Sequence, residues 1–515
     1  MLLLLVAAPL LMPVIELLLH PLAWSVWIEA DRIATLFTHT ITLSFGTLLI
    51  SLPLGIVTAV ILERGNLSAH KLFALLLVFG LFIPLPLMAS AWQIAFGTLG
   101  PRPWDTGLFP AILIHSIAAF PWVVLILILG LRRVEPELEE DALQVMRGIA
   151  VVWSITLRRI RPALVMATLW VLVQTSTEIV VTDLMLVRTM AEEVYTQFVT
   201  SSIGGARAMA LTLPTFVIAG VIAFSVTNYH PGLLTQRTSR QLFEIPRWAS
   251  FLGLLILFAI VAIPSINWLI KIRSVSTFLI SVRGQFYLIF DSLLWAIVAA
   301  VIALSLAILA AWQSLESVRF RRCVVVLAVC AWVMPGPVLG IGMKSLIDLF
   351  MDVESFIFPA SWIHPLTFVL YEEANPSPVV WVHVVRLFPF ALALVAPVVA
   401  SIPIELRESA KLDGASPLQI LRHVILPPLR WFLLPVTLVL SLLVLGEVSA
   451  SKLVQIPGHA TFAQEFFNQM HYGVSSTLAS LGVLQIIVTL GVFAFIVYVS
   501  RGFVRSPNSD PGNGL

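Results

Sequence analysis

Long apolar runs separated by short polar segments are the feature that most constrains how this chain can fold. A helix that crosses a bilayer needs about 20 consecutive apolar residues, and about twelve runs approach that length. The runs cover residues 2–20, 39–62, 72–95, 109–131, 164–186, 208–229, 248–270, 286–312, 323–346, 381–403, 431–453 and 475–499. Charged residues make up only 11% of the 515 positions, against about 25% in soluble domains, so lipid must cover most of the surface. The pattern predicts an all-α integral membrane protein with about 12 transmembrane helices.

Basic residues near the helix ends indicate the orientation, because cytoplasmic segments carry an excess of Lys and Arg. With both termini in the cytoplasm, the cytoplasmic segments hold about twenty of these residues and the outer segments about seven. The two richest segments, 132–161 and 407–430, then both lie inside. The run 2–20 lacks a basic start and a small-residue cleavage site, so it is expected to remain as a helix. The net charge of +2 gives no indication of a nucleic-acid partner.

Two parts of the chain share residues at one constant separation. The matching pairs, each 268 positions apart, are His115 and His383, Phe120 and Phe388, Pro121 and Pro389, Glu137 and Glu405, Leu138 and Leu406, Glu140 and Glu408, and Ala142 and Ala410. Upstream, the prolines of 84–86 match those of 335–337 at 251 positions, and downstream 189–197 matches 461–469 at 272 positions. Seven identities at one spacing are hard to obtain by chance, so we expect two copies of one unit.

The repeat divides the chain into a first half, residues 1–229, a polar linker, 230–247, and a second half, 248–515. Each half holds six apolar runs, and an even number keeps both copies in the same orientation. We therefore expect a parallel repeat of two six-helix units, related by an axis along the membrane normal. The change of separation places an insertion of about 17 residues in the second copy, within the outer loop 347–380. The linker is expected in the cytoplasm.

A polar segment after the fourth run of the second half carries turn and helix-start residues. Ala410 belongs to a short helix with a small-residue face, and Gly414 permits a turn where a side chain would be blocked. Ser-Pro at 416–417 restarts a second helix as N-cap and first residue. Pro427 is expected to end that helix at the membrane. The segment therefore predicts two short helices at an angle, forming a compact projection on the cytoplasmic face.

The first half carries a weaker version of this segment. Glu140 and Ala142 keep its start, but Met146 stands in the place of the glycine and Gly148 follows two residues later. Arg159 takes the place of the proline. We therefore expect the first projection to bend differently from the second.

The second segment resembles the Glu-Ala-Ala loop of the permeases of ATP-binding-cassette (ABC) importers, with Glu408, Ala410, Gly414, Leu426 and Pro427 at the matching positions. The resemblance implies that the projection docks into a cleft of a separate ATPase subunit, a homodimer that serves both halves. It also implies an extracytoplasmic solute-binding protein and a location in the bacterial inner membrane.

A fused pair of six-helix permease units of this length is similar to the ferric-iron importer permeases of bacteria. The segment 446–450, followed by 461–463 and 470–473, resembles a run that this group carries after the fifth helix, and the segment around Glu178 is similar. Ferric iron is therefore the first expected substrate. Thiamine, phosphonate, polyamine or another small solute remain alternatives in the same class of importer.

The sequence carries no signature of an enzyme. It has no Gly-x-x-x-x-Gly-Lys-[Ser/Thr] phosphate loop, no nucleophile elbow and no His-Glu-x-x-His, so ATP hydrolysis must come from a separate subunit. No cofactor and no metal site are expected. An ion-coupled secondary transporter is the alternative from another class, but it would need acidic residues near the midplane of broken helices. A membrane enzyme is disfavoured by the absence of a catalytic constellation.

Ionisable residues within membrane runs are candidates for function. Glu178 and Glu447 lie at equivalent positions near the outer end of the fifth run of each half. They either line the translocation path or cap and hydrogen-bond within their own half, and both readings stay open. His115 and His383 have no second ligand at helical spacing, which favours packing over metal binding. Arg386 has no counterpart in the first half, and a pairing with Glu447 is one possibility.

Overall fold

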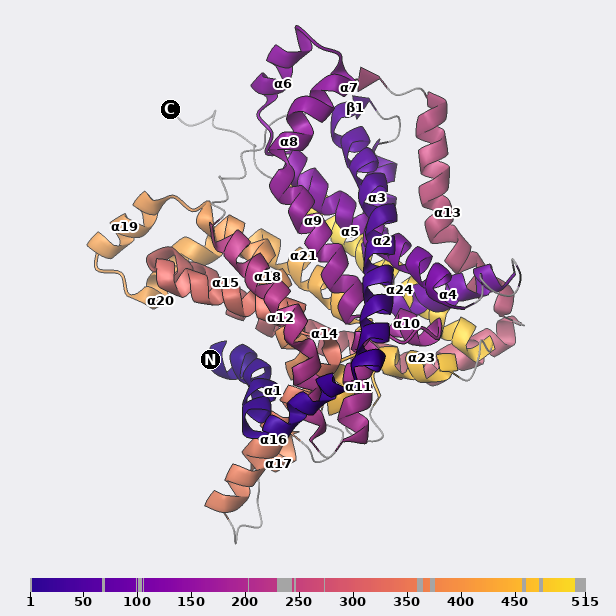
Figure 1. The fold of residues 1–515 in the computed structure, drawn as a ribbon. Coiled ribbons are helices and arrows are strands. Elements are labelled where there is room, and N and C mark those ends of the chain that lie inside the picture. Colours follow the sequence, from indigo (N-terminus) through magenta and orange to yellow (C-terminus); the bar gives the residue numbers. More distant parts are fainter. Residues whose placement is uncertain are drawn as a thin grey trace.

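The computed structural model consists almost entirely of helices (Figure 1). It describes residues 2–66, 70–98, 100, 104, 106–201, 203–228, 243–244, 247–272, 274–358, 365–370, 376–455, 460–471 and 476–504. Two strands of two residues each, β1 (Gly65–Asn66) and β2 (Phe243–Glu244), pair in parallel. Most of the predicted linker 230–247 lies outside the described residues.

The helices of the first half follow the predicted apolar runs, with short extra elements between them. They are η1 (Leu3–Ala7), α1 (Ala8–Leu19), η2 (Pro21–Ile28), α2 (Ala30–Arg64), α3 (His70–Leu81), α4 (Leu85–Gly97), α5 (Leu108–Leu131), α6 (Pro136–Leu143), α7 (Gly148–Val151), η3 (Val152–Thr156), α8 (Leu157–Arg159), α9 (Arg161–Thr177), α10 (Val180–Leu184), α11 (Met190–Thr200) and α12 (Gly204–Asn228).

The second half repeats much of this order. Its helices are α13 (Arg247–Lys271), α14 (Val275–Glu316), α15 (Val318–Val333), α16 (Gly336–Ile357), α17 (Pro365–Leu370), α18 (Ser377–Ala400), α19 (Ile404–Leu412), α20 (Pro417–Ile420), η4 (Leu421–Ile425), α21 (Leu426–Val444), α22 (Ser451–Val454), α23 (Phe462–His471) and α24 (Ser476–Val504). Helix α16 is longer than α4, and α17 follows it within the outer loop where the insertion is predicted.

Eight helices within the described residues are long and apolar enough to cross a membrane, or up to 11 if each bent helix pair counts as one span. This supports an all-α, multi-pass membrane protein. The predicted run 164–186 corresponds to α9, which has 17 residues, and to α10 after a short break. The number of about twelve spans stays a prediction.

Two predicted spans are broken, which the apolar pattern alone did not indicate. The run 72–95 bends by 103° between α3 and α4, and the run 323–346 bends by 111° between α15 and α16. Pro84 and Pro335 stand at the two breaks with extended backbones. Proline lacks the N–H that would continue the helical ladder, so the chain turns there.

Helix α2 shows how these helices pack. Its buried face carries the small or hydroxylated residues Thr47, Ser51 and Gly55, whereas Leu49 and Leu54 are exposed. A Cβ atom at Gly55 would overlap a methyl carbon of Val123 on α5, so the two helices approach closely. Small residues inside and large apolar residues outside are typical of helices that pack in lipid.

The first helix of each half lies against the other half. Helix α1 packs on α12 and on α16, and α13 packs on α24 and on α4. The α1–α16 contact is close, because a Cβ atom at Gly342 would overlap the backbone of Pro9. Within each half, the second, fourth and fifth spans pack together, as α2 with α5 and α9, and as α14 with α18 and α21. The two halves are therefore joined by exchanged helices.

Candidate functional site

The second projection is built around Gly414. Helix α19 ends at Leu412, and Gly414 has φ +77°, in the left-handed region that favours glycine. Its N–H donates to the carbonyl of Lys411 at 3.0 Å, and the N–H of Ala415 donates to the carbonyl of Ala410 at 3.0 Å. This pair of bonds is a Schellman motif. The predicted turn at Gly414 is thus present, and Ala410 provides one of the carbonyls that close it.

The helix after this turn begins as predicted but does not end as predicted. The hydroxyl of Ser416 accepts from the backbone N–H of Gln419, and the side-chain oxygen of Gln419 accepts from the backbone N–H of Ser416. This reciprocal pair is a capping box at the start of α20, with Pro417 in the first turn. Helix α20 continues through the π-helical η4 into α21, so residues 417–444 form one helix. The prediction that Pro427 stops the helix is wrong. Pro427 lies in the first turn of α21, where the wider π turn before it tolerates the missing N–H.

Most side chains of the second projection are exposed to solvent. None of the residues of α19 is buried, and Glu408 is exposed. Leu412 and Leu418, on either side of the turn, are 88% and 72% exposed. Between the two short helices lies a hollow of about 310 Å³, and Gly414 and Ala415 are among the residues that line it. An apolar tip beside a small hollow is a surface suited to contact with another protein.

The first projection has the same two-helix plan with a different bend. Helix α6 buries Ala142, and the N–H of Met146 donates to the carbonyl of Ala142 at 2.9 Å. Met146 is not among the described residues with positive φ, so the turn forms without a left-handed residue. Gly148 is the first residue of α7, and Glu140 is exposed. Figure 1 shows α6–α8 and α19–α20 as two separate projections at the edge of the helical bundle.

A buried ion pair fixes the first projection to the membrane helices. The guanidinium of Arg64, the last residue of α2, lies 2.9 Å from the carboxylate of Glu139 on α6, with side chains only 3% and 1% exposed. Arg64 also donates to the carbonyl of Leu131 at 2.8 Å, and the hydroxyl of Thr156 donates to Glu139 at 2.8 Å. These bonds join α2, the end of α5, α6 and η3. We call the Arg64–Glu139 pair the first brace.

The second projection has a brace of opposite polarity. Glu316, the last residue of α14, accepts from Lys411 at 2.7 Å and from Arg407 at 3.4 Å. Arg407 lies 268 positions after Glu139, so the base and the acid have exchanged places between the halves. This pair is more exposed than the first. Neither brace was predicted from the sequence, although a charged residue stands at the end of each second span, Arg64 in α2 and Glu316 in α14.

The carboxylates of Glu178 and Glu447 serve as helix caps. Glu178 accepts from the backbone N–H groups of Val180 and Val181. Glu447 accepts from those of Ala450 and Ser451 at 2.8 and 3.1 Å. Each carboxylate thus holds the break between the fifth span and the short helix that follows it, α10 or α22. These contacts favour the capping alternative, and a role in the path stays a prediction.

Each of these carboxylates faces the equivalent histidine of its own half. The Nε2 atom of His115 lies 3.7 Å from Glu178, and that of His383 lies 3.9 Å from Glu447. The sequence did not connect these pairs, because α5 and α9 meet only in the folded chain. Arg386 donates to the carbonyl of Met334 at 3.0 Å, at the break before α16. Among the ion pairs that the described residues make within 4.0 Å, none joins Arg386 to Glu447.

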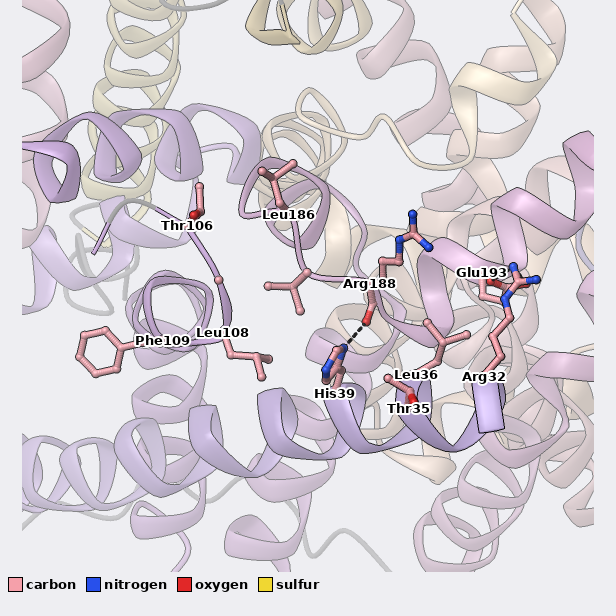
Figure 2. Close-up of a pocket in the computed structure, with 12 residues that line it drawn as sticks. Arg32, Thr35, Leu36, His39, Thr106, Leu108, Phe109, Leu186, Arg188 and Glu193 are labelled. Carbon is pink, nitrogen blue, oxygen red and sulfur yellow. Dashed lines mark hydrogen bonds and ion pairs between the residues drawn. The ribbon is translucent and has the colours of Figure 1, made fainter. Parts of the chain in front are cut away.

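A hollow of about 720 Å³ opens at the end of α2 opposite to Arg64. Figure 2 shows Arg32 beside Glu193, and the ring of His39 directed at the carbonyl oxygen of Arg188 at 3.0 Å. The guanidinium of Arg32 reaches Glu193 at 2.6 Å. Leu186 lines the hollow with φ +56° and is exposed. The walls therefore mix paired charges with apolar side chains.

Residues 303–505 match the family of binding-protein-dependent transport system inner membrane components. This match supports a permease of the ABC importer class. The matched region contains the second projection and the fifth and sixth spans of the second half. A permease of this class transports and is not an enzyme, and it works with an ATPase and a solute-binding protein. No curated protein sequence matches the chain.

Proposed function

We propose that the chain is a pair of permease units for an ABC importer, with both ATPase-docking projections and a translocation path between them in one polypeptide. The observation that carries this proposal is the pair of projections, each tied by an ion pair to the last residue of the second long span of its own half. A coupling element must transmit force, and a projection braced to a long helix can do so.

The arrangement of elements in the two halves supports a twofold relation. The broken third spans, the π-helical segments η3 and η4, and the capped short helices α10 and α22 occur in the same order. The exchanged packing of α1 and α13 is reciprocal. An axis along the membrane normal with the path near it is the arrangement expected of a parallel repeat.

Coupling to ATP would enter at the two projections. Glu408, Ala410, Gly414 and Pro427 belong to the second, and Glu140, Ala142 and Gly148 to the first. The exposed apolar tip of the second projection supports docking to an ATPase subunit, with a homodimer giving one cleft for each projection. Both projections would then lie in the cytoplasm together with both termini, and the hollow beside Arg32 would face the solute-binding protein.

The proposed substrate is inferred from the resemblance to other permeases and not from a binding site. Ferric iron delivered by a bacterial binding protein is the first candidate, and thiamine, phosphonate, polyamine or another small solute are the alternatives. Glu178, Glu447 and Arg386 would be the charged groups of the path.

Reconstitution tests the function. The chain is placed in vesicles with an ATPase and a binding protein encoded beside it, and uptake of labelled ferric iron is measured with and without ATP. We expect uptake that requires ATP, the ATPase and the loaded binding protein. Uptake driven by an ion gradient without the ATPase would refute the proposal, and ATP-dependent uptake of another solute would replace iron only.

A further inference from the structure

Four aromatic side chains meet where the two halves face each other. Trp122 stacks on Trp170 with ring centroids 4.6 Å apart, and Trp170 stacks on Trp332 at 5.3 Å. Phe390 lies 5.9 Å from Trp170 and 6.2 Å from Trp122. The rings come from α5 and α9 of the first half and from α15 and α18 of the second. We call these four residues the aromatic cluster.

The contact between Trp122 and Phe390 locates the cluster within the fold. These residues are 268 positions apart, the separation that relates equivalent positions of the two halves. Two equivalent positions related by an axis can touch only if both lie close to that axis. This step rests on the proposed twofold relation. The aromatic cluster therefore lies on the line along which a path between the halves must run.

The cluster also has a defined depth. Trp122 and Phe390 each follow the histidine that faces a capping carboxylate, His115 or His383, by seven residues. Seven residues are about two helical turns, or about 10 Å. Both helices run from the histidine toward the projections, so the rings lie between the carboxylates and the proposed cytoplasmic side.

We propose that the aromatic cluster is the cytoplasmic gate of the translocation path, with Trp122 and Phe390 as the closing pair. The four residues are each partly buried, and stacked rings near the axis would form an apolar constriction, which excludes ions by keeping water out. Trp170 and Trp332 hold the closing pair in place by stacking. The structure is thus in a state closed toward the cytoplasm.

Two observations indicate that the cluster can separate. The indole N–H of Trp170 is buried and has no acceptor among the described residues, although a buried Trp N–H usually finds one. An open gate would expose this donor to water. In addition, Trp170 lies on α9, which ends at the break capped by Glu178, and Trp332 lies next to the end of α15 at the 111° bend. Both rings thus sit on helices that end at a break.

Cysteine accessibility tests the gate without any partner protein. Ser449 packs against Gly336, near Arg386, and Arg386 precedes Phe390 by one turn of α18. Ser449→Cys is introduced after Cys323 and Cys330 are replaced by serine. A membrane-impermeant methanethiosulfonate is added to the cytoplasmic face of inside-out vesicles. We expect Trp122→Ala/Phe390→Ala to raise the modification rate at position 449 at least tenfold.

A matched control removes two rings elsewhere. Phe286 and Phe290 stack at 6.4 Å on exposed positions of α14, so Phe286→Ala/Phe290→Ala should leave the rate unchanged. Trp122→Phe keeps a ring and should also leave it unchanged. Phe390→Ala alone should give an intermediate rise, and it keeps the test open if the double variant does not insert.

The outcomes separate the gate from the proposed function. An unchanged rate in both the single and the double alanine variants, with the vesicles intact, overturns the gate. An equal rise in the α14 control also overturns it, because the effect would then be general loosening. Failure of ATP-driven uptake in the wild type would refute the importer function instead, since the accessibility measurement uses neither ATP nor a binding protein.

Discussion

Removing the acid of the first brace should destabilise the protein strongly. Glu139→Ala would leave the guanidinium of Arg64 uncompensated where its side chain is only 3% exposed. It would also remove the acceptor of the Thr156 hydroxyl. Breaking a buried pair by deleting one partner costs about 3–5 kcal/mol. We expect a loss of that size, because the acceptors left to Arg64 are the uncharged carbonyls of Leu131 and Glu63.

The second brace supplies the matched control. Glu316 is 46% exposed, and its partner Lys411 is 50% exposed. Ion pairs in contact with solvent contribute about 0–1 kcal/mol, so Glu316→Ala should cost no more than about 1 kcal/mol. The two substitutions delete the same kind of side chain at the two braces. The expected difference comes from burial and from the Thr156 hydroxyl, which loses its acceptor only at the first brace.

Denaturant unfolding in detergent micelles, followed by circular dichroism, measures both free energies of unfolding. A third variant, Arg64→Met/Glu139→Leu, replaces the buried pair by apolar side chains and should recover most of the stability, because the uncompensated charge is gone. Equal losses for Glu139→Ala and Glu316→Ala would refute this reasoning. So would a double variant as unstable as Glu139→Ala alone.

Three further predictions concern transport. Gly414→Trp should abolish ATP-dependent uptake while the protein still inserts, because a residue with a side chain at φ +77° costs about 1–2 kcal/mol. Met146→Trp should reduce uptake less. Normal uptake in both variants would exclude the loops from coupling. Replacing Glu178 and Glu447 by Gln should reduce uptake of a cationic substrate in vesicles, whereas wild-type uptake would leave capping as their role. Leu418→Asp should weaken binding of the ATPase subunit in a pull-down without changing stability, because that side chain is 72% exposed, and unchanged binding would contradict docking at this tip.

The second projection could be predicted in detail because its determinants are local. A left-handed glycine, an N-cap serine and a proline in the first turn each act on the backbone within a few residues. Gly414, Ser416 and Pro417 therefore stand where the sequence placed them. The prediction failed at Pro427, where a π turn in the preceding segment removes the conflict that a proline usually creates.

The sequence by itself determined the apolar runs, the two projections and the constant separation of 268 positions between matching residues. These features depend on side-chain polarity and on neighbours along the chain. Only the tertiary structure decided which distant residues meet. It placed Arg64 on Glu139 and His115 near Glu178, and it brought Trp122 against Phe390. The physical reason is that helices in lipid associate through close packing at particular crossings, and a crossing point is not encoded in the period of either helix.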